Sequence, residues 1–177
     1  MTEVILVDEE DQQIGVMEKI EAHEKGLLHR AFSVFIMNKN GQMLLQQRAL
    51  SKYHSPGLWT NACCSHPSPG EYTLTAANRR LKEEMGFSCP LTKIGMFTYK
   101  TEFDNGLTEH EFDHLLLGLY DGEVQPDKTE VEDYKWLNMD EIDDALIKGN
   151  AHFSSWFKLA FPMVKGWLGL KSEENLL

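Results

Sequence analysis

Cysteine is scarce in this sequence, and features typical of secreted, membrane and nucleic-acid-binding proteins are missing as well. The 177 residues include only three cysteines, Cys63, Cys64 and Cys89, whereas a disulfide framework uses an even number of spaced cysteines. We therefore expect a reducing compartment, the cytoplasm. No apolar run approaches the ~20 residues of a membrane-spanning helix, and the acidic first ten residues do not resemble a signal peptide.

Positive charge is also in short supply. Lys and Arg number 17 against 28 Asp and Glu, which gives a formal net charge of −11. A nucleic-acid partner needs a basic surface that releases counterions, so this composition argues against one. An anionic substrate would need a local group of basic side chains or a metal ion. We expect a small-molecule substrate, no nucleic-acid or membrane partner, and a monomer or weak homodimer.

Strand and helix patterns alternate along the chain, with no internal repeat, low-complexity tract or linker. Apolar and β-branched patterns predict strands at 4–7, 14–17, 29–37, 43–48, 94–103, 107–120 and 134–138. Helical spacing predicts helices at 19–24, 74–85, 140–149 and 155–168, the last broken or kinked at Pro162. Residues 169–177 are expected to fray. The interleaving indicates an α/β fold, a mixed sheet between helices, built as a single domain over 1–177.

The segment 60–87 combines a loop that holds the paired cysteines with a helix that ends at Gly86. The apolar stripe of this helix is made of Leu74, Ala77, Leu81 and Met85. Arg80 and Glu84 lie on the shoulder of that stripe, one turn apart, while Glu83 lies roughly opposite. The helix can therefore direct Glu84 into a cleft. The alternative is a simple surface ion pair between Arg80 and Glu84.

Carboxylates recur on one face of the strand predicted at 107–120. Side chains of a strand alternate between its two faces, so Glu109, Glu111 and Asp113 share one face. Carboxylates that point at a core are costly, but they are useful at a metal ion. Together with histidines they form a candidate metal shell made of His23, His29, His66, Glu109 and Glu111. Such a shell suits Mn, Mg, Fe or Zn, although surface or hydrogen-bonded histidines are the alternative interpretation.

The adjacent cysteines are predicted to differ in environment. Neighbouring residues of an extended segment point to opposite sides, whereas Cys64 and His66, two residues apart, point to the same side. If His66 binds a metal, Cys64 is the thiol near the reacting atoms. Cys63 is then expected to turn away and behave as a small buried apolar residue.

The loop and helix at 65–86 resemble the Nudix box, G-x5-E-x7-R-E-x-x-E-E-x-G. The matching residues are Glu71, Arg79, Glu83, Glu84 and Gly86. Two positions depart from the pattern: Ser65 stands where the first glycine belongs, and Arg80 stands where the first glutamate of the arginine-glutamate pair belongs. A Nudix hydrolase uses that glutamate in its metal cluster, so the departure counts against pyrophosphate hydrolysis.

Most of the chain is similar to the type I isopentenyl-diphosphate isomerases of the Nudix superfamily. The segments that carry the resemblance are 18–19, His23, 29–33, 48–52, 56–61, 64–67, the degenerate Nudix helix, Tyr99, 109–111 and 153–156. That family lacks the Nudix arginine-glutamate pair in the same way, so Arg80 fits the resemblance. Ser65 remains a departure from the family's common glycine.

The resemblance implies an isomerase that interconverts isopentenyl diphosphate and dimethylallyl diphosphate in isoprenoid biosynthesis. The reaction adds a proton at one carbon and removes another elsewhere, through a tertiary carbocation. By resemblance, Glu111 serves with Tyr99 on the protonating side, and Cys64 serves on the other side. Trp156 then stabilises the carbocation by a cation–π contact; a plain core tryptophan is the alternative.

The same resemblance implies a diphosphate site with basic side chains from Lys19, Arg48, Lys52 and Arg80. A Mg²⁺ held by Glu84 and the backbone carbonyl of Cys64 would bridge the phosphate oxygens. A second divalent ion, Mn²⁺, Mg²⁺ or Zn²⁺, would occupy the His/Glu shell. Solvated surface lysines are the alternative for Lys19 and Lys52. Two other functions stay open: a Nudix hydrolase of a diphosphate-linked substrate, and a non-catalytic metal- or ligand-binding module.

Overall fold

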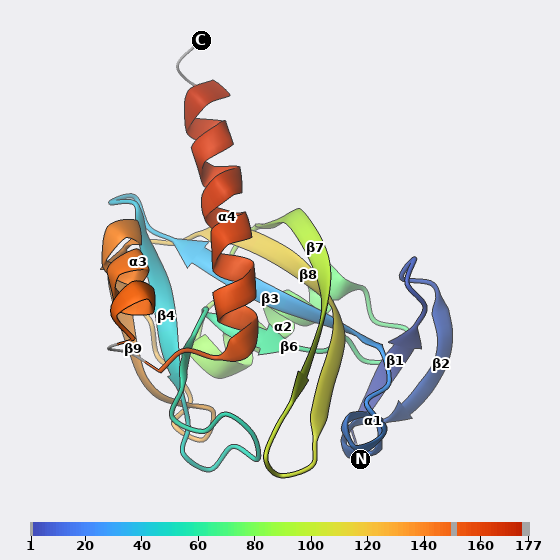
Figure 1. Cartoon of the computed structure of the whole chain (residues 1–177). Coiled ribbons are helices and arrows are strands. Elements are labelled where there is room, and N and C mark those ends of the chain that lie inside the picture. The colour runs from blue at the N-terminus through green and yellow to red at the C-terminus, as the bar shows by residue number, and fades with distance from the viewer. Residues whose placement is uncertain (1, 150–151, 175–177) are drawn as a thin grey trace.

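Strand β3 (His29–Met37) lies at the centre of one mixed β-sheet that has helices on both faces (Figure 1). The structure is a computed structural model that describes residues 2–149 and 152–174. All residues of β3 except Arg30 are buried, as expected for an apolar strand covered on both faces. The predicted α/β fold with a mixed sheet between helices is confirmed.

The elements follow the chain in the predicted order, with two additions. The strands are β1 (Glu3–Val7), β2 (Gln13–Glu18), β3 (His29–Met37), β4 (Gln42–Arg48), β5 (Trp59–Thr60), β6 (Cys63–Ser65), β7 (Leu91–Glu102), β8 (Thr108–Leu119) and β9 (Val131–Asn138). The helices are α1 (Lys19–Lys25), α2 (Thr73–Met85), α3 (Met139–Lys148) and α4 (Ser155–Glu174). The additions are β5 and β6, which lie in the segment predicted as loop.

The central position of β3 follows from its pairing partners. β8 runs parallel to β3, with His29 opposite Glu111. β6 runs antiparallel to β3, with Ser33 opposite Cys64. β6 has only three residues, too few to show a period-two pattern. Its strand character therefore comes from pairing with β3, which the local sequence does not reveal.

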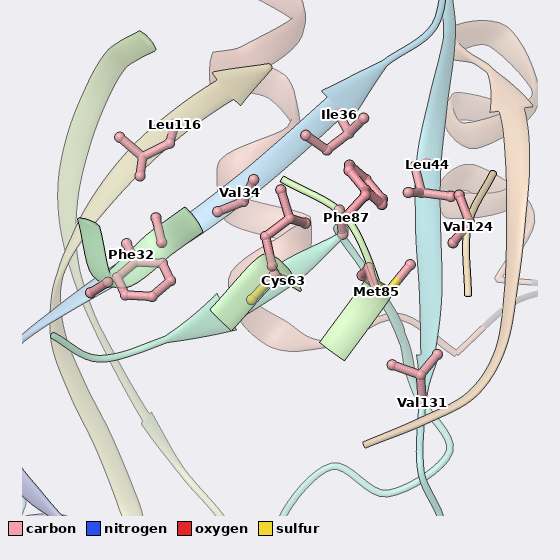
Figure 2. Close-up of a cluster of buried hydrophobic side chains, with 14 residues drawn as sticks. Phe32, Val34, Ile36, Leu44, Cys63, Met85, Phe87, Leu116, Val124 and Val131 are labelled. Atoms are coloured by element: carbon pink, nitrogen blue, oxygen red, sulfur yellow. The ribbon is translucent and has the colours of Figure 1, made fainter. Parts of the chain in front are cut away.

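Two apolar clusters fix the helices on the sheet. On one face, α2 packs against Val34 and Ile36 of β3, and Cys63 points into the same cluster (Figure 2). On the other face, α3 and α4 pack over Phe35, whose ring lies 6.3 Å from that of Phe157. Alternate residues of β3 thus face opposite helices, as the period of a strand requires.

The buried face of α2 differs from the predicted stripe at one residue. The stripe residues that are fully buried are Ala77, Leu81 and Met85. Leu74 is 45% exposed because it lies in the first turn of the helix, and Ala76 is buried instead. Gly86 ends the helix at φ 84°, where a Cβ would lie 2.5 Å from the carbonyl oxygen of Gln125, so this position requires glycine.

Helix α4 is longer than predicted. It runs without interruption from Ser155 through Pro162 to Glu174, rather than ending near residue 168. Residues 169–174, which were expected to fray, are helical, and 175–177 lie outside the described residues. The far end of the helix extends beyond the sheet (Figure 1). Although α4 has 20 residues, no helix in the described ranges is both long and apolar enough to cross a membrane.

Truncating the buried stripe of α2 should destabilise the fold far more than truncating its first turn. Leu81→Ala leaves a cavity in the packed cluster and should lower the free energy of unfolding by about 2–5 kcal/mol. Leu74→Ala is the matched control at a half-exposed position and should stay within about 0.5 kcal/mol. Urea denaturation followed by circular dichroism measures both. Equal losses in the two variants would contradict this assignment of the buried face.

Candidate active site

The candidate site lies where one end of β3 meets β6, β8, α1 and the 49–58 loop. The pairing of β3 places Glu111 opposite His29 at this end of the strand and Cys64 opposite Ser33, further along it, from two different neighbouring strands. The loop and the β7–β8 turn lie side by side at the lower end of the molecule in Figure 1, where Asn105 Nδ2 donates to the Tyr53 carbonyl at 3.0 Å. The site is therefore assembled from segments that are far apart in the sequence.

Four of the five predicted metal ligands converge. Their ligand atoms all lie within 4.8 Å of one another and belong to His23, His29, His66 and Glu111. Glu111 Oε1 lies 2.9 Å from His66 Nε2 and 3.7 Å from His29 Nε2. Three imidazoles and a carboxylate form a donor set that suits a divalent transition metal.

His23 and His29 are oriented as metal ligands. His23 Nδ1 lies 2.6 Å from the Lys19 carbonyl oxygen, and His29 Nδ1 lies 2.8 Å from that of Leu27. Each Nδ1 must donate its proton there, so each Nε2 carries a lone pair. Both Nε2 atoms are buried without a hydrogen-bond partner among the described residues. A metal ion is the partner that fits two such lone pairs.

Burial favours the neutral form of two imidazoles of this group. It lowers the pKa of His23, and it lowers the pKa of His66 to about 3 even though His66 contacts Glu111. Neutral imidazole is the form that binds metals. The residues present therefore fit the metal that the predicted shell requires.

Glu109, the fifth predicted ligand, lies beside the four converging ligands rather than among them. The Tyr99 hydroxyl joins the two carboxylates, at 2.7 Å from Glu111 Oε2 and 3.1 Å from Glu109 Oε2. Burial and the charge of Glu111 raise the pKa of Glu109. Burial acts in the same direction on Glu111, but its contacts with His29 and His66 outweigh it and hold that pKa well below its ordinary value.

The Cys64 thiol is fixed by several side chains. Its sulfur donates to Asn61 Oδ1 at 3.0 Å and accepts a hydrogen bond from Trp156 Nε1 at 2.9 Å. Ser33 Oγ lies 3.4 Å from the sulfur and donates to Asp113 Oδ2 at 2.7 Å. Burial raises the pKa of the thiol. The environment thus orients Cys64 while keeping it protonated in the absence of ligand.

The two cysteines point to opposite faces, as the extended backbone predicts. Cys63 is fully buried in the cluster beneath α2 (Figure 2). Cys64 lines a cavity together with His66. Ser65 follows in the same strand, opposite Phe32, in extended backbone that does not need the glycine of the Nudix pattern.

The predicted phosphate-binding cations share two adjoining cavities. An inner cavity of about 60 Å³ also contains Cys64, Tyr99 and Glu111 in its wall, and an outer cavity has about 710 Å³. The predicted cations that line the inner cavity are Lys19, Arg48, Lys52 and Arg80. Lys19, Lys52 and Arg80 line the outer cavity as well.

These cations are partly neutralised by carboxylates. Arg80 Nη2 lies 2.7 Å from Glu84 Oε1 and 3.3 Å from Glu130 Oε1, and Lys52 forms an ion pair with Glu130. The predicted Arg80–Glu84 pair therefore exists, but Glu84 is buried at the cavity rather than on the surface. Glu83 remains 46% exposed, as its place on the helix predicted.

Some residues of the site had no predicted role. Asp113 shares a strand face with the two glutamates, so the period-two pattern could have identified it. Asn61, Ser33, His54 and Glu130 carry no such signal, because their partners come from distant segments. No spacing rule connects a loop residue such as His54 to a strand residue such as Glu109.

Comparisons with known proteins place this geometry in a family. The NUDIX domain family matches residues 27–157. A protein of Pectobacterium atrosepticum named isopentenyl-diphosphate Delta-isomerase is 51% identical over 176 residues, which cover 99% of this chain and 98% of that protein. A protein of the same name from Burkholderia multivorans is 45% identical over 169 residues, covering 93% of this chain and 96% of that protein.

Solved structures share the fold at low sequence identity. A Deinococcus radiodurans protein has a TM-score of 0.72 at 18% identity, covering 89% of this chain and 96% of that one. A MutT protein from Methanosarcina mazei has a TM-score of 0.64 at 17% identity, covering 84% of this chain and 95% of that one. These likenesses support the NUDIX fold alone.

Removal of one converging imidazole should empty the metal site. Loss of a residue that only hydrogen-bonds to a metal ligand typically weakens metal binding by roughly 10–100-fold. Because His29 Nε2 points into the ligand group, we expect His29→Ala to weaken the binding of a divalent ion by more than that. His110→Ala is the control, since His110 Nδ1 instead faces the Gly26 carbonyl at 3.0 Å. Metal content after loading and dialysis measures the effect. Full retention by His29→Ala would contradict the ligand assignment.

Proposed function

The chain belongs to the isopentenyl-diphosphate Delta-isomerase family of NUDIX-domain proteins, and we propose that its site uses Cys64 and the Tyr99–Glu111 pair to interconvert isopentenyl diphosphate and dimethylallyl diphosphate. The observation that supports this most directly is one inner cavity whose wall contains that thiol, that tyrosine–carboxylate pair and four cations. Isomerisation of an alkenyl diphosphate by proton addition and removal needs an acid, a base and positive charge for the diphosphate, and these groups can supply them.

The diphosphate would bind in the outer cavity, at the shared cations Lys19, Lys52 and Arg80, with Arg48 deeper in the inner cavity. The inner cavity is small compared with the ~300–1,000 Å³ of ordinary ligand pockets, so the substrate must use both cavities. A Mg²⁺ held by Glu84 and the Cys64 carbonyl would offset the carboxylates that face these cations. Binding of the diphosphate must displace Glu130 from at least one of its two partners.

The His/Glu group would hold the second divalent ion through His23, His29, His66, Glu109 and Glu111. Such an ion supplies positive charge that makes a nearby proton donor more acidic and fixes its ligands in place. The identity of this ion, Mn²⁺, Mg²⁺ or Zn²⁺, belongs to the proposal, as does the role of Glu109 as its fifth ligand.

Proton transfer follows from the placement of donors. The Tyr99 hydroxyl bonds to Glu111 Oε2, and burial raises the pKa of Tyr99, so a proton is retained between the two groups. Its delivery to the terminal alkene carbon forms a C–H bond and leaves a tertiary carbocation. Cys64, whose own proton must first be released to solvent, then acts as the thiolate: it takes up a proton from the neighbouring carbon on the other side, and the electron pair of that C–H bond forms the new double bond.

In the proposal, Trp156 contributes to two steps: stabilisation of the carbocation and removal of the proton by Cys64. Its Nε1–H is bonded to the Cys64 sulfur, which orients the thiol and favours its deprotonated form. Its ring lines the inner cavity, where an indole face stabilises a desolvated cation by about 2 kcal/mol. The indole therefore stabilises charge of opposite sign at its edge and at its face.

Hydrolysis of a diphosphate is less favoured by the same residues. The position where the Nudix pattern has its first glutamate carries Arg80, whose guanidinium contacts Glu84 and Glu130. A cation there cannot join a carboxylate cluster that binds a metal for water activation.

Product analysis distinguishes the possible functions. The protein, incubated with isopentenyl diphosphate, Mg²⁺ and Mn²⁺, should yield the allylic isomer without release of phosphate. Release of inorganic phosphate would support a hydrolase instead, and no change would support a binding module. Phosphorus and proton NMR of the same sample measure all of these outcomes.

The two cysteines provide a matched pair of variants. Cys64→Ala should stay folded, still bind inorganic pyrophosphate, and lose about 10²–10⁴-fold in turnover, the usual contribution of a positioned acid–base group. Cys63→Ala should turn over at close to the parent rate, because its sulfur only packs beneath α2. An alkylating substrate analogue, mapped by peptide mass, should label Cys64. An inactive Cys63→Ala, or a label on Cys63, would overturn the assignment.

A further inference from the structure

His54 is a polar side chain that is built into the site without having been assigned a role. It is 8% exposed and lines the inner cavity. Its ring stacks on Phe103 with centroids 5.3 Å apart and meets Trp156 edge-on at 6.1 Å. Arg48 Nη2 donates to its backbone carbonyl at 3.1 Å. These contacts fix the orientation of the imidazole.

The imidazole of His54 directs one nitrogen at Glu109. His54 Nε2 lies 3.3 Å from Glu109 Oε1, while its Nδ1 is buried without a partner among the described residues. An imidazole nitrogen that faces a carboxylate oxygen at this distance must carry the hydrogen, because an ionised carboxylate can only accept. Because the carboxylate lies at Nε2, that hydrogen belongs on Nε2.

Glu109 has few other donors. It is 3% exposed, and its second oxygen faces the Tyr99 hydroxyl at 3.1 Å. Tyr99 has only one hydrogen and lies closer to Glu111, at 2.7 Å. A buried carboxylate without donors is costly, so the N–H of His54 is the contact that can hold Oε1.

We infer that His54 is a positioning residue of the metal centre, whose Nε2–H holds Glu109 Oε1 and leaves Oε2 at the Tyr99 hydroxyl, which also contacts Glu111. His54 does not belong to the four converging ligands, so its place is behind Glu109 rather than on the ion. The inference rests on the proposed role of Glu109 as a ligand. Partners that orient a ligand in this way typically change metal affinity 10–100-fold when removed.

Two substitutions separate the N–H of His54 from its ring. His54→Phe keeps a ring to stack on Phe103 but has no N–H. His54→Gln loses the ring but keeps a side-chain N–H of similar reach. We expect His54→Phe to bind Mn²⁺ about 10–100-fold more weakly than the parent, and His54→Gln to remain within about threefold of it. The measurement is Mn²⁺ titration of the metal-free full chain, without substrate, by calorimetry and by the electron paramagnetic resonance signal of free Mn²⁺.

Control variants decide what a negative result means. His152→Phe changes an exposed histidine and should bind Mn²⁺ like the parent. If Glu109→Gln weakens binding and a folded His54→Phe does not, the inference is overturned while the metal site stands. If Glu109→Gln leaves binding unchanged, Glu109 is not a ligand, and both the inference and that part of the proposed function fail.

The glutamine variant keeps the inference testable if the phenylalanine variant does not fold. A folded His54→Gln that binds Mn²⁺ as weakly as Glu109→Gln would contradict the role of the N–H donor. Product formation by the parent protein, measured separately, tests the isomerase activity and does not depend on His54.

Discussion

The pairing of β3 with two different neighbours is the constraint on which the site depends. β8 lies parallel to it and β6 antiparallel, so Glu111 lies opposite His29 at one end of the strand and Cys64 lies opposite Ser33, further along it. Hydrogen-bond register is set in whole residues, and a slip of one residue would turn Glu111 or Cys64 to the opposite face. Apolar packing on both faces of β3 opposes such a slip, and the geometry of the site therefore rests on the stability of the core.

The polar groups of the site are buried to a degree that a structural core would not tolerate without compensation. The buried polar side chains of the site include two glutamates, an aspartate and several histidines. Backbone carbonyls hold the Nδ1 atoms of His23 and His29, and Tyr99 connects the two glutamates. Among the buried polar atoms that have no partner in the described part of the chain are the Nε2 atoms of His23 and His29. A fold can retain the energetic cost of buried polar atoms without partners when a ligand of the functional protein supplies the missing interaction.

The 49–58 loop connects the two halves of the site. Three consecutive residues contact different parts of it: Lys52 pairs with Glu130 at the outer cavity, Tyr53 covers the Lys19 ammonium at 5.4 Å, and His54 faces Glu109. A single short segment therefore contacts both the cations that line the outer cavity and a carboxylate beside the four converging side chains. Because Lys52 and His54 are only two residues apart, a movement of the backbone at one of them is expected to shift the other.

The sequence by itself determined the elements and the residue types of the chemistry. Period-two and helical spacing located β3, β8 and α2, and they placed Glu84 inward and Glu83 outward, because such periods are local properties of the backbone. Alternation in an extended segment separated Cys63 from Cys64 for the same reason. Tertiary structure decided what depends on contact between distant segments: the strand character of β6, the exposure of Leu74, the position of Glu109 beside the four converging side chains, and the contacts of Asn61 and His54. Those features depend on which strands and loops lie beside β3, and no local sequence pattern specifies these non-local contacts.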